Sequence, residues 1–204
     1  MASLYFKYAA MNSGKSTQLL QAQYNYFERG LNPVAMTAHI DTRSGKGKIV
    51  SRLGIDCPAY TFDASTDLFT FVEDMHASKA IDVLFIDEAQ FLSEGQVFQC
   101  ARIVDELDIP VLCYGLKTDF MGKLFPGSET LLRLADNIEE IKAICWCGKK
   151  ATMTARLTPK GDMAKAGQQI AIGGNEMYTA LCRKHFMKGE AKAIPVQDVK
   201  KSAA

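Results

Sequence analysis

The segment with the clearest chemistry lies near the N-terminus and reads Ala9-Ala10-Met11-Asn12-Ser13-Gly14-Lys15-Ser16-Thr17. It follows a short apolar run and leads into a helical pattern that opens at Gln18. A strand, a tight turn and Gly-Lys-Ser at a helix start form the context of a phosphate-binding P-loop. The first glycine of the usual pattern is missing, because Ala9 stands in its place. A helix N-cap that carries Gly-Lys-Ser by chance is the alternative.

A P-loop binds a nucleotide mainly through its main chain. Backbone N–H groups surround the phosphates, and the helix N-terminus adds its partial positive charge. Lys15 would reach the β- and γ-phosphates, and the Ser16 hydroxyl would bind Mg²⁺. The segment therefore predicts a nucleotide site.

Two adjacent carboxylates, Asp87 and Glu88, directly follow residues 81–86, the clearest buried strand in the sequence. In P-loop enzymes the carboxylate that completes the Mg²⁺ site ends a buried strand beside the P-loop strand, and Asp87 fits that position. Glu88 would face the γ-phosphate, where a carboxylate can accept a proton from an attacking oxygen. The pair could instead begin a loop or cap a helix. The residues alone also leave open whether the attacking oxygen belongs to water or to a substrate hydroxyl.

Cysteine and histidine form two pairs, Cys145-Trp-Cys147 and Cys182-Arg-Lys-His185, which are separated by 34 residues. Sulfur and imidazole ligands supplied in pairs suit a tetrahedral Zn²⁺, and four protein ligands would make the site structural. The first spacer is one residue shorter than the common one, although Gly148 permits a tight turn. Buried free thiols beside a solvated histidine are the alternative.

Alternating strands and helices must position these groups. The predicted strands cover 33–38, 81–86 and 110–114, while 53–62 is ambiguous. The predicted helices cover 15–29, 66–78 and a segment after the capping-box pair Ser93 and Gln96. This alternation is typical of an α/β fold with a parallel sheet covered on both faces. The pattern changes near Ala143, so we expect a P-loop α/β nucleotide-binding domain over 1–142, a zinc-binding domain over 143–191 and a disordered tail over 192–204.

Composition limits the partners and the compartment. The chain has 204 residues, of which 48% are hydrophobic, and this suits one or two globular domains. A net charge of +1 provides no basic field for direct nucleic-acid binding. No apolar run approaches the roughly 18 residues that span a membrane, and no export signal is recognisable. Six cysteines without such a signal suggest thiols or metal ligands rather than disulfides, so we expect a cytoplasmic protein.

The chain resembles the type II thymidine kinases, especially the bacterial members, from Leu4 to His185. The resemblance rests on five motifs in the same order: Tyr8-Ala-Ala-Met-Asn-Ser-Gly-Lys-Ser-Thr17, Asp87-Glu-Ala-Gln-Phe91, Cys113-Tyr-Gly-Leu-Lys-Thr-Asp-Phe120, Ile172-Gly-Gly-Asn-Glu-Met-Tyr178 and Cys182-Arg-Lys-His185. It implies a RecA-like parallel sheet with flanking helices and a small zinc-ribbon-like domain. The implied reaction is ATP-dependent phosphorylation of the 5′-hydroxyl of thymidine, and of deoxyuridine, in pyrimidine deoxynucleoside salvage.

The resemblance also implies a role for each matched position. The expected ATP-binding residues are positions 9–16 together with Asp87, Glu88, Ala89, Gln90, Asp41, Thr42 and Arg43. Glu88 would be the general base, and Ser16 and Asp87 would hold Mg²⁺. Phe120 would stack on thymine, while a lasso loop over 169–178 would close over the base. The expected thymidine-binding residues are Phe120, Gln169, Ile170, Ala171, Ile172, Gly173 and Tyr178, with Met11 and Phe91 on the pocket wall.

The same resemblance implies ATP and thymidine as substrates, dTTP as a feedback inhibitor and a homotetramer. Zn²⁺ on Cys145, Cys147, Cys182 and His185 would tie the ends of the lasso loop together. A P-loop ATPase that acts on nucleic acid and carries a zinc ribbon is the alternative from another class. The charge of +1 and the lack of an evident second nucleotide-binding domain are arguments against it.

Overall fold

A computed structural model of the chain describes residues 1–40, 47–170 and 177–191. Several expected features lie outside the described residues, namely Asp41, Thr42, Arg43, Ala171, Ile172, Gly173 and the tail over 192–204. None of the helices in the described ranges has the length and apolar character that crossing a bilayer requires.

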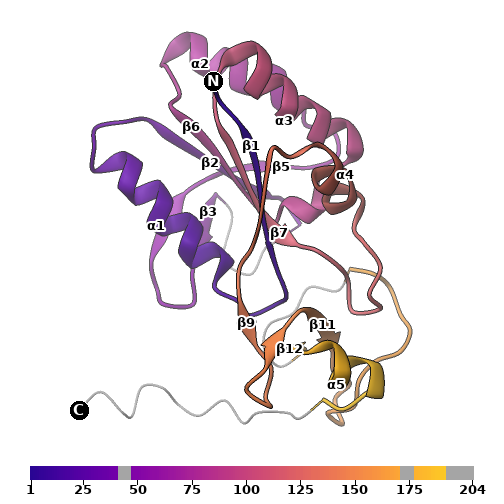
Figure 1. Ribbon diagram of the computed structural model, residues 1–204. Coiled ribbons are helices and arrows are strands. Elements are labelled where there is room, and N and C mark those ends of the chain that lie inside the picture. The colour runs from indigo at the N-terminus through magenta and orange to yellow at the C-terminus, as the bar shows by residue number, and fades with distance from the viewer. Residues whose placement is uncertain (41–46, 171–176, 192–204) are drawn as a thin grey trace, which may run out of the picture.

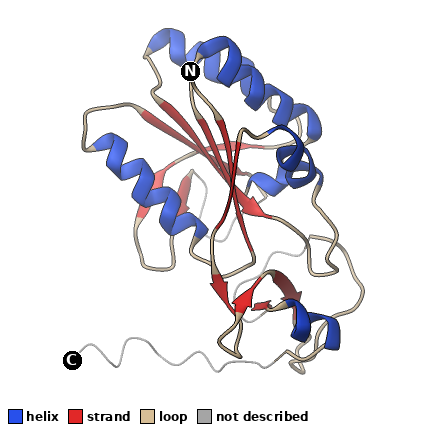
Figure 2. Ribbon diagram, viewed as in Figure 1, coloured by secondary structure: helices blue, strands red, loops and turns tan. Residues whose placement is uncertain are grey.

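The centre of the protein is a sheet of six parallel strands (Figures 1 and 2), which confirms the predicted α/β class. Its strands, in spatial order, are β5 (Tyr60–Phe62), β2 (Pro33–Ala38), β6 (Val83–Asp87), β7 (Val111–Leu116), β1 (Leu4–Ala9) and β8 (Asn137–Glu140). Every residue of β6 is buried, as expected for a central parallel strand with helices on both faces. A short antiparallel pair, β3 (Lys48–Val50) and β4 (Asp56–Pro58), lies outside this sheet.

Helices cover both faces of the sheet (Figure 1). Helix α1 (Lys15–Phe27) covers one face, and α2 (Leu68–Ser78), α3 (Glu94–Leu107) and α4 (Pro126–Leu134) cover the other. Alternate residues of β6 divide between two hydrophobic clusters: Val83 and Phe85 pack with α1, whereas Leu84 and Ile86 pack with α2 and α3. This period of two is what a strand buried on both faces requires.

Capping side chains set the starts of two helices. The predicted helix over 66–78 begins at Leu68 because the Asp67 carboxylate accepts a hydrogen bond from the Thr70 N–H at 3.0 Å. The predicted capping box is confirmed at α3. Ser93 Oγ accepts from the Gln96 N–H at 3.2 Å, and Gln96 Oε1 accepts from the Ser93 N–H at 3.0 Å.

The C-terminal part is built from short elements at one end of the sheet (Figure 1). They are the antiparallel pair β9 (Ala143–Ile144) and β10 (Lys150–Ala151), the antiparallel pair β11 (Met153–Arg156) and β12 (Tyr178–Leu181), and helix α5 (Arg183–Lys188). These elements share a small cluster of buried residues, which Ala10 joins from the N-terminal segment. The division of the chain at residue 142 stays a prediction.

Candidate active site and metal centre

The predicted P-loop segment has the expected strand, turn and helix. Gly14 caps α1 in the left-handed region with φ of 80°, and Asn12 also has a positive φ, of 64°. Glycine adopts this conformation at little cost, and asparagine tolerates it better than most residues. The loop therefore turns sharply between β1 and α1 and places Lys15, which is only 7% exposed, in the first turn of the helix.

Ser16 and Asp87 meet across the end of the sheet, because Ser16 Oγ donates to Asp87 Oδ2 at 2.8 Å. The expectation that the Asp87 strand lies beside the P-loop strand is wrong, since β7 separates β6 from β1. The pair still forms because α1 contacts both β7 and β6. Burial and the neighbouring Glu88 charge raise the pKa of Asp87 to about 7, against the Ser16 hydrogen bond and the Lys15 charge.

Glu88 lies directly after β6 in a conformation that is unusual for a residue with a side chain. Its φ is 53°, in the left-handed region, and it is 7% exposed. Backbone strain of this kind costs about 1–3 kcal/mol and is commonly found at functional sites. A one-turn helix, η1 (Ala89–Phe91), follows it. Within this turn, Gln90 Nε2 donates to Glu88 Oε2, and Gln90 Oε1 accepts from the Leu116 N–H at 3.0 Å. Gln90 thus holds the Glu88 carboxylate against the end of β7.

Helix α4 packs tightly on this turn, and sequence analysis did not identify the residues responsible. A Cβ atom on Gly127 would lie 2.6 Å from the Leu92 carbonyl oxygen and 2.7 Å from that of Ala89. Ser128 Oγ donates to the Leu116 carbonyl oxygen. Glycine at 127 therefore allows α4 to approach the backbone that carries Gln90, and nothing local in the sequence indicates this contact.

The residues expected to bind thymidine are partly gathered around Arg156, a side chain that sequence analysis missed. Phe120 is 2% exposed, and the Arg156 Cζ atom lies 3.9 Å from the centre of its ring. Arg156 Nε donates to the Tyr178 hydroxyl at 3.0 Å, and its two terminal nitrogens donate to the carbonyl oxygens of Gln168 and Gln169 at 2.8 and 3.1 Å. The Gln169 carbonyl oxygen thus points to Arg156.

Other expected site residues are placed differently. Met11 and Asn12 face the β11–β12 pair: the Met11 N–H donates to Thr154 Oγ1 at 3.0 Å, and Asn12 Nδ2 donates to the Tyr178 carbonyl oxygen at 3.1 Å. Phe91 packs edge-to-face on Phe125, with ring centres 6.0 Å apart, at the border of the central core. Ile170 is 38% exposed.

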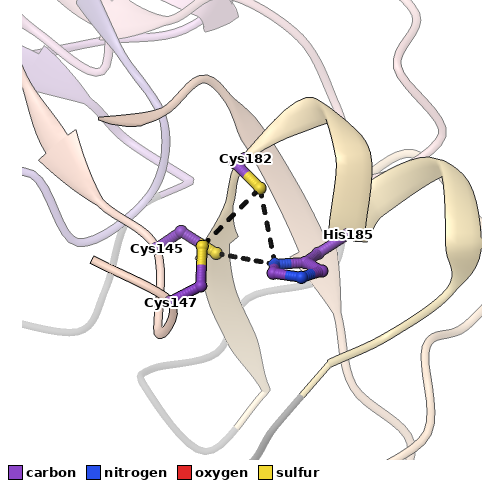
Figure 3. A group of neighbouring side chains, drawn as sticks. All are labelled: Cys145, Cys147, Cys182 and His185. Carbon is purple, nitrogen blue, oxygen red and sulfur yellow. Dashed lines mark hydrogen bonds between the residues drawn. The ribbon is translucent and has the colours of Figure 1, made fainter. Parts of the chain in front are cut away.

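The two Cys/His pairs meet in one cluster, as predicted (Figure 3). One sulfur or nitrogen atom from each of Cys145, Cys147, Cys182 and His185 lies within 4.8 Å of all the others. His185 Nδ1 is 3.4 Å from both the Cys145 and the Cys182 sulfur. Gly148, with φ of 79°, closes the tight turn that the short Cys145/Cys147 spacing requires. Three sulfurs and one imidazole nitrogen at this separation fit a tetrahedral zinc ion.

Surrounding groups favour metal binding by this cluster. Burial opposes ionisation of Cys145, but backbone N–H groups of Cys147 and Cys182 and the His185 ring together lower the pKa of its thiol to about 6. Trp146 stacks on the His185 ring, with centres 4.2 Å apart and planes 17° apart. His185 Nε2, on the opposite side of the ring from the cluster, is 3.7 Å from Glu190 Oε2. Such outer contacts orient a metal-binding histidine.

Comparison with known proteins agrees with this geometry. The sequence profile of the family described as thymidine kinase matches residues 2–186. A thymidine kinase of Shewanella oneidensis is 54% identical over 186 residues, which are 91% of this chain and 97% of that protein. Thymidine kinases of Agrobacterium fabrum and Vibrio cholerae are 52% and 51% identical, each over 97% of their own length and over 92% and 91% of this chain. The chain therefore belongs to the thymidine kinase family.

Proposed function

We propose that this protein transfers the γ-phosphoryl group of ATP to the 5′-hydroxyl of thymidine, which yields dTMP for pyrimidine deoxynucleoside salvage, and that deoxyuridine is a second substrate. Family membership supports the proposal, and one observation carries it: Ser16 Oγ lies 2.8 Å from Asp87 Oδ2, directly beside Glu88. A P-loop hydroxyl, a metal-binding carboxylate and a base are the groups that phosphoryl transfer to an alcohol requires.

The loop between β1 and α1 would bind the phosphates of ATP. Ser13 Oγ is buried and has no hydrogen-bond partner among the described residues, so a phosphate oxygen would supply the acceptor that it lacks. Lys15 would neutralise phosphate charge beside it. Ser16 and Asp87 provide the oxygen ligands that Mg²⁺ prefers, and Mg²⁺ bound there would withdraw charge from the phosphates. The proposed ATP-binding set also keeps the family-derived residues Ala89, Asp41, Thr42 and Arg43.

Glu88 would act as the general base. Its carboxylate would accept the proton of the 5′-hydroxyl while that oxygen attacks the γ-phosphorus and the bond to the β-phosphate oxygen breaks, which releases ADP. Gln90 would keep the carboxylate in one orientation, because its amide donates to Glu88 and accepts from the Leu116 N–H. Phe120, Tyr178 and the lasso loop would hold the base of the nucleoside.

The Cys/His cluster would hold a structural Zn²⁺ on Cys145, Cys147, Cys182 and His185, since four protein ligands complete a tetrahedral site. The ligand pairs flank the segment that contains the lasso loop, so the metal would fix both ends of that segment. The family resemblance supports two further parts of the proposal, namely a homotetramer and inhibition by dTTP.

Replacing Glu88 with glutamine tests the mechanism. Glu88→Gln should lower kcat for thymidine by about 10²–10⁴-fold, the usual range for loss of a general base, with ATP binding largely kept. Glu94→Gln, a change of the same kind at an exposed ion pair with Arg133, should leave kcat unchanged. Normal turnover by Glu88→Gln would exclude Glu88 as the base. An assay of ATP consumption that responds to DNA but not to thymidine would overturn the proposed function itself.

A further inference from the structure

We propose that Arg156 is a positioning residue for nucleoside binding, which joins the start of the lasso loop to Phe120 and Tyr178. The inference rests on the proposed function, because it concerns how the thymidine site is held in shape. It is carried by the contacts of the guanidinium group of Arg156, a residue that is only 9% exposed.

That guanidinium group contacts three segments that are distant in sequence. It stacks on the Phe120 ring, beyond the end of β7, with 3.9 Å between Cζ and the ring centre. It donates to the Tyr178 hydroxyl at 3.0 Å, at the first residue of β12. It also donates to the carbonyl oxygens of Gln168 and Gln169 at 2.8 and 3.1 Å, where the lasso loop begins.

The position of Arg156 in the β11–β12 pair explains why it reaches all three. It is the last residue of β11 and lies opposite Tyr178 in the antiparallel register. The chain leaves the pair directly after this register point, where the Leu157 N–H donates to the Met177 carbonyl oxygen at 2.7 Å. The Ala164 N–H then donates back to the Arg156 carbonyl oxygen at 2.8 Å. Arg156 therefore fixes where the chain enters the lasso loop.

A second hydrogen bond holds the same end of the loop. Gln169 Nε2 donates to Asp119 Oδ2 at 3.0 Å, and Asp119 Oδ1 accepts from the N–H groups of Met121 and Lys123 at 2.8 and 2.9 Å. Gln169 is thus held by its carbonyl oxygen through Arg156 and by its side chain through Asp119. The turn at 119–123 and the lasso entry form one unit with the Phe120 ring between them.

Only arginine provides all of these contacts at once. Its planar group carries five N–H donors in fixed directions and stacks flat on an aromatic ring, whereas the ammonium of lysine is a compact point charge. Lysine at 156 would keep the charge but lose the flat stacking on Phe120 and the fixed directions in which the guanidinium donates to its three acceptors. The loop entry at residues 168–169 would then no longer be held by Arg156 before the nucleoside binds, so affinity for thymidine should fall more than turnover of the bound substrate.

Steady-state kinetics with both substrates test this. Arg156→Lys should raise the KM for thymidine about 10- to 100-fold, with the KM for ATP within about twofold of the wild type. Arg133→Lys, an arginine in an exposed ion pair on α4, is the matched control and should change neither KM. An unchanged KM for thymidine in Arg156→Lys would overturn the proposal. If the KM values for thymidine and ATP rose equally and Tm fell strongly, the proposal would also be overturned, and Arg156 would have a purely structural role.

A double-mutant cycle with Tyr178→Phe adds a readout that does not depend on Arg156→Lys alone. Tyr178→Phe should raise the KM for thymidine in the wild type, but should have a clearly smaller effect in the Arg156→Lys background, because the hydrogen bond from Arg156 Nε to the Tyr178 hydroxyl is already lost there. If the two substitutions change the KM for thymidine by factors that simply multiply, Arg156 and Tyr178 are not coupled and the proposal is contradicted.

Proteolysis tests the loop entry directly. Tryptic cleavage after the exposed Lys165 should be faster in Arg156→Lys than in the wild type when no nucleoside is present. An unchanged rate of cleavage would contradict the proposal that Arg156 holds the loop entry. If the wild-type protein phosphorylates thymidine but these tests give the contrary results, the role of Arg156 is refuted while the proposed function stands.

Discussion

Replacing Gly127 with alanine should disturb the catalytic turn from a position that contacts no substrate. Gly127 is the second residue of α4, and its Cβ would lie 2.6 Å from the Leu92 carbonyl oxygen, 2.7 Å from that of Ala89 and 3.1 Å from that of Gln90. Backbone oxygens cannot move aside as a flexible side chain can, so either α4 or η1 must move by roughly half an ångström or more to restore ordinary contact.

The size of the effect follows from this overlap. Overpacking of a well-packed site costs about 1–3 kcal/mol, and alanine in a helix returns about 0.4–1 kcal/mol relative to glycine. The net loss of roughly 1–2 kcal/mol should lower Tm by about 2–8 °C in a protein of this size. Because η1 carries Gln90, which holds Glu88, kcat should fall by about tenfold while the KM for ATP changes little.

Thermal unfolding and steady-state kinetics measure both quantities, and α3 offers a matched control. Gly95 is likewise the second residue of its helix, but the nearest atom to its Cβ would be Ser93 Oγ at 4.0 Å. Gly95→Ala should therefore keep normal kcat and gain about 0.4–1 kcal/mol of stability. If Gly127→Ala had the Tm and kcat of the wild type, the contact between α4 and η1 would not position Glu88.

Two further perturbations address the metal sites. Asp87→Asn should abolish turnover yet raise the Tm of nucleotide-free protein at pH 8, because burial and the Glu88 charge raise the pKa of Asp87 to about 7. The gain in Tm should shrink as the pH falls towards 5, because Asp87 in the folded wild type is then protonated and uncharged. A lower Tm for Asp87→Asn at pH 8 would contradict the raised pKa of Asp87. Zinc chelation should change the fluorescence of Trp146, the only tryptophan, which stacks on His185, and should raise the KM for thymidine. A chelated, folded protein with an unchanged KM would exclude the link between the zinc and the nucleoside site.

The sequence predicted those elements that are determined by interactions between residues close together in the chain. The strand over 33–38 matches β2 to the residue. A short run of mostly apolar residues that begins at a proline is typical of a buried strand. The capping box at Ser93 fixes the start of α3 through hydrogen bonds between residues three apart. The Cys/His pairs were predictable for the same reason, since each pair is close in sequence and the ligand chemistry requires the two pairs to meet.

The order of the strands within the sheet could not be predicted from local sequence signals. Apolar strands of equal character carry no information on their neighbours, so the placement of β7 between β1 and β6 could not be predicted. The ambiguous stretch over 53–62 contains β4 and β5, which are stabilised by pairing with β3 and β2 rather than by their own pattern. Tertiary pairing decides such short strands.

Residues that act across several segments were also beyond prediction. Arg156 ends a four-residue strand with no motif around it, and its importance comes from acceptors that lie between 12 and 22 positions away and from a distant ring. Gly127 is likewise an ordinary helix residue until its distance to the Ala89 and Leu92 carbonyl oxygens is known. Motifs identify groups that react, whereas the groups that hold them are defined only by contacts.

The donor and acceptor parts of the proposed site are joined through the P-loop itself. The Met11 N–H donates to Thr154 Oγ1 at 3.0 Å in β11, and Asn12 Nδ2 donates to the Tyr178 carbonyl oxygen at 3.1 Å in β12. Thr154 is a buried residue, 2% exposed, so losing this hydrogen bond would leave a buried polar group without that partner. Any rearrangement of residues 11–12 when phosphate binds must therefore act directly on the strand pair that carries Arg156 and Tyr178. These two hydrogen bonds therefore fix the position of the P-loop relative to the strand pair of the proposed nucleoside site.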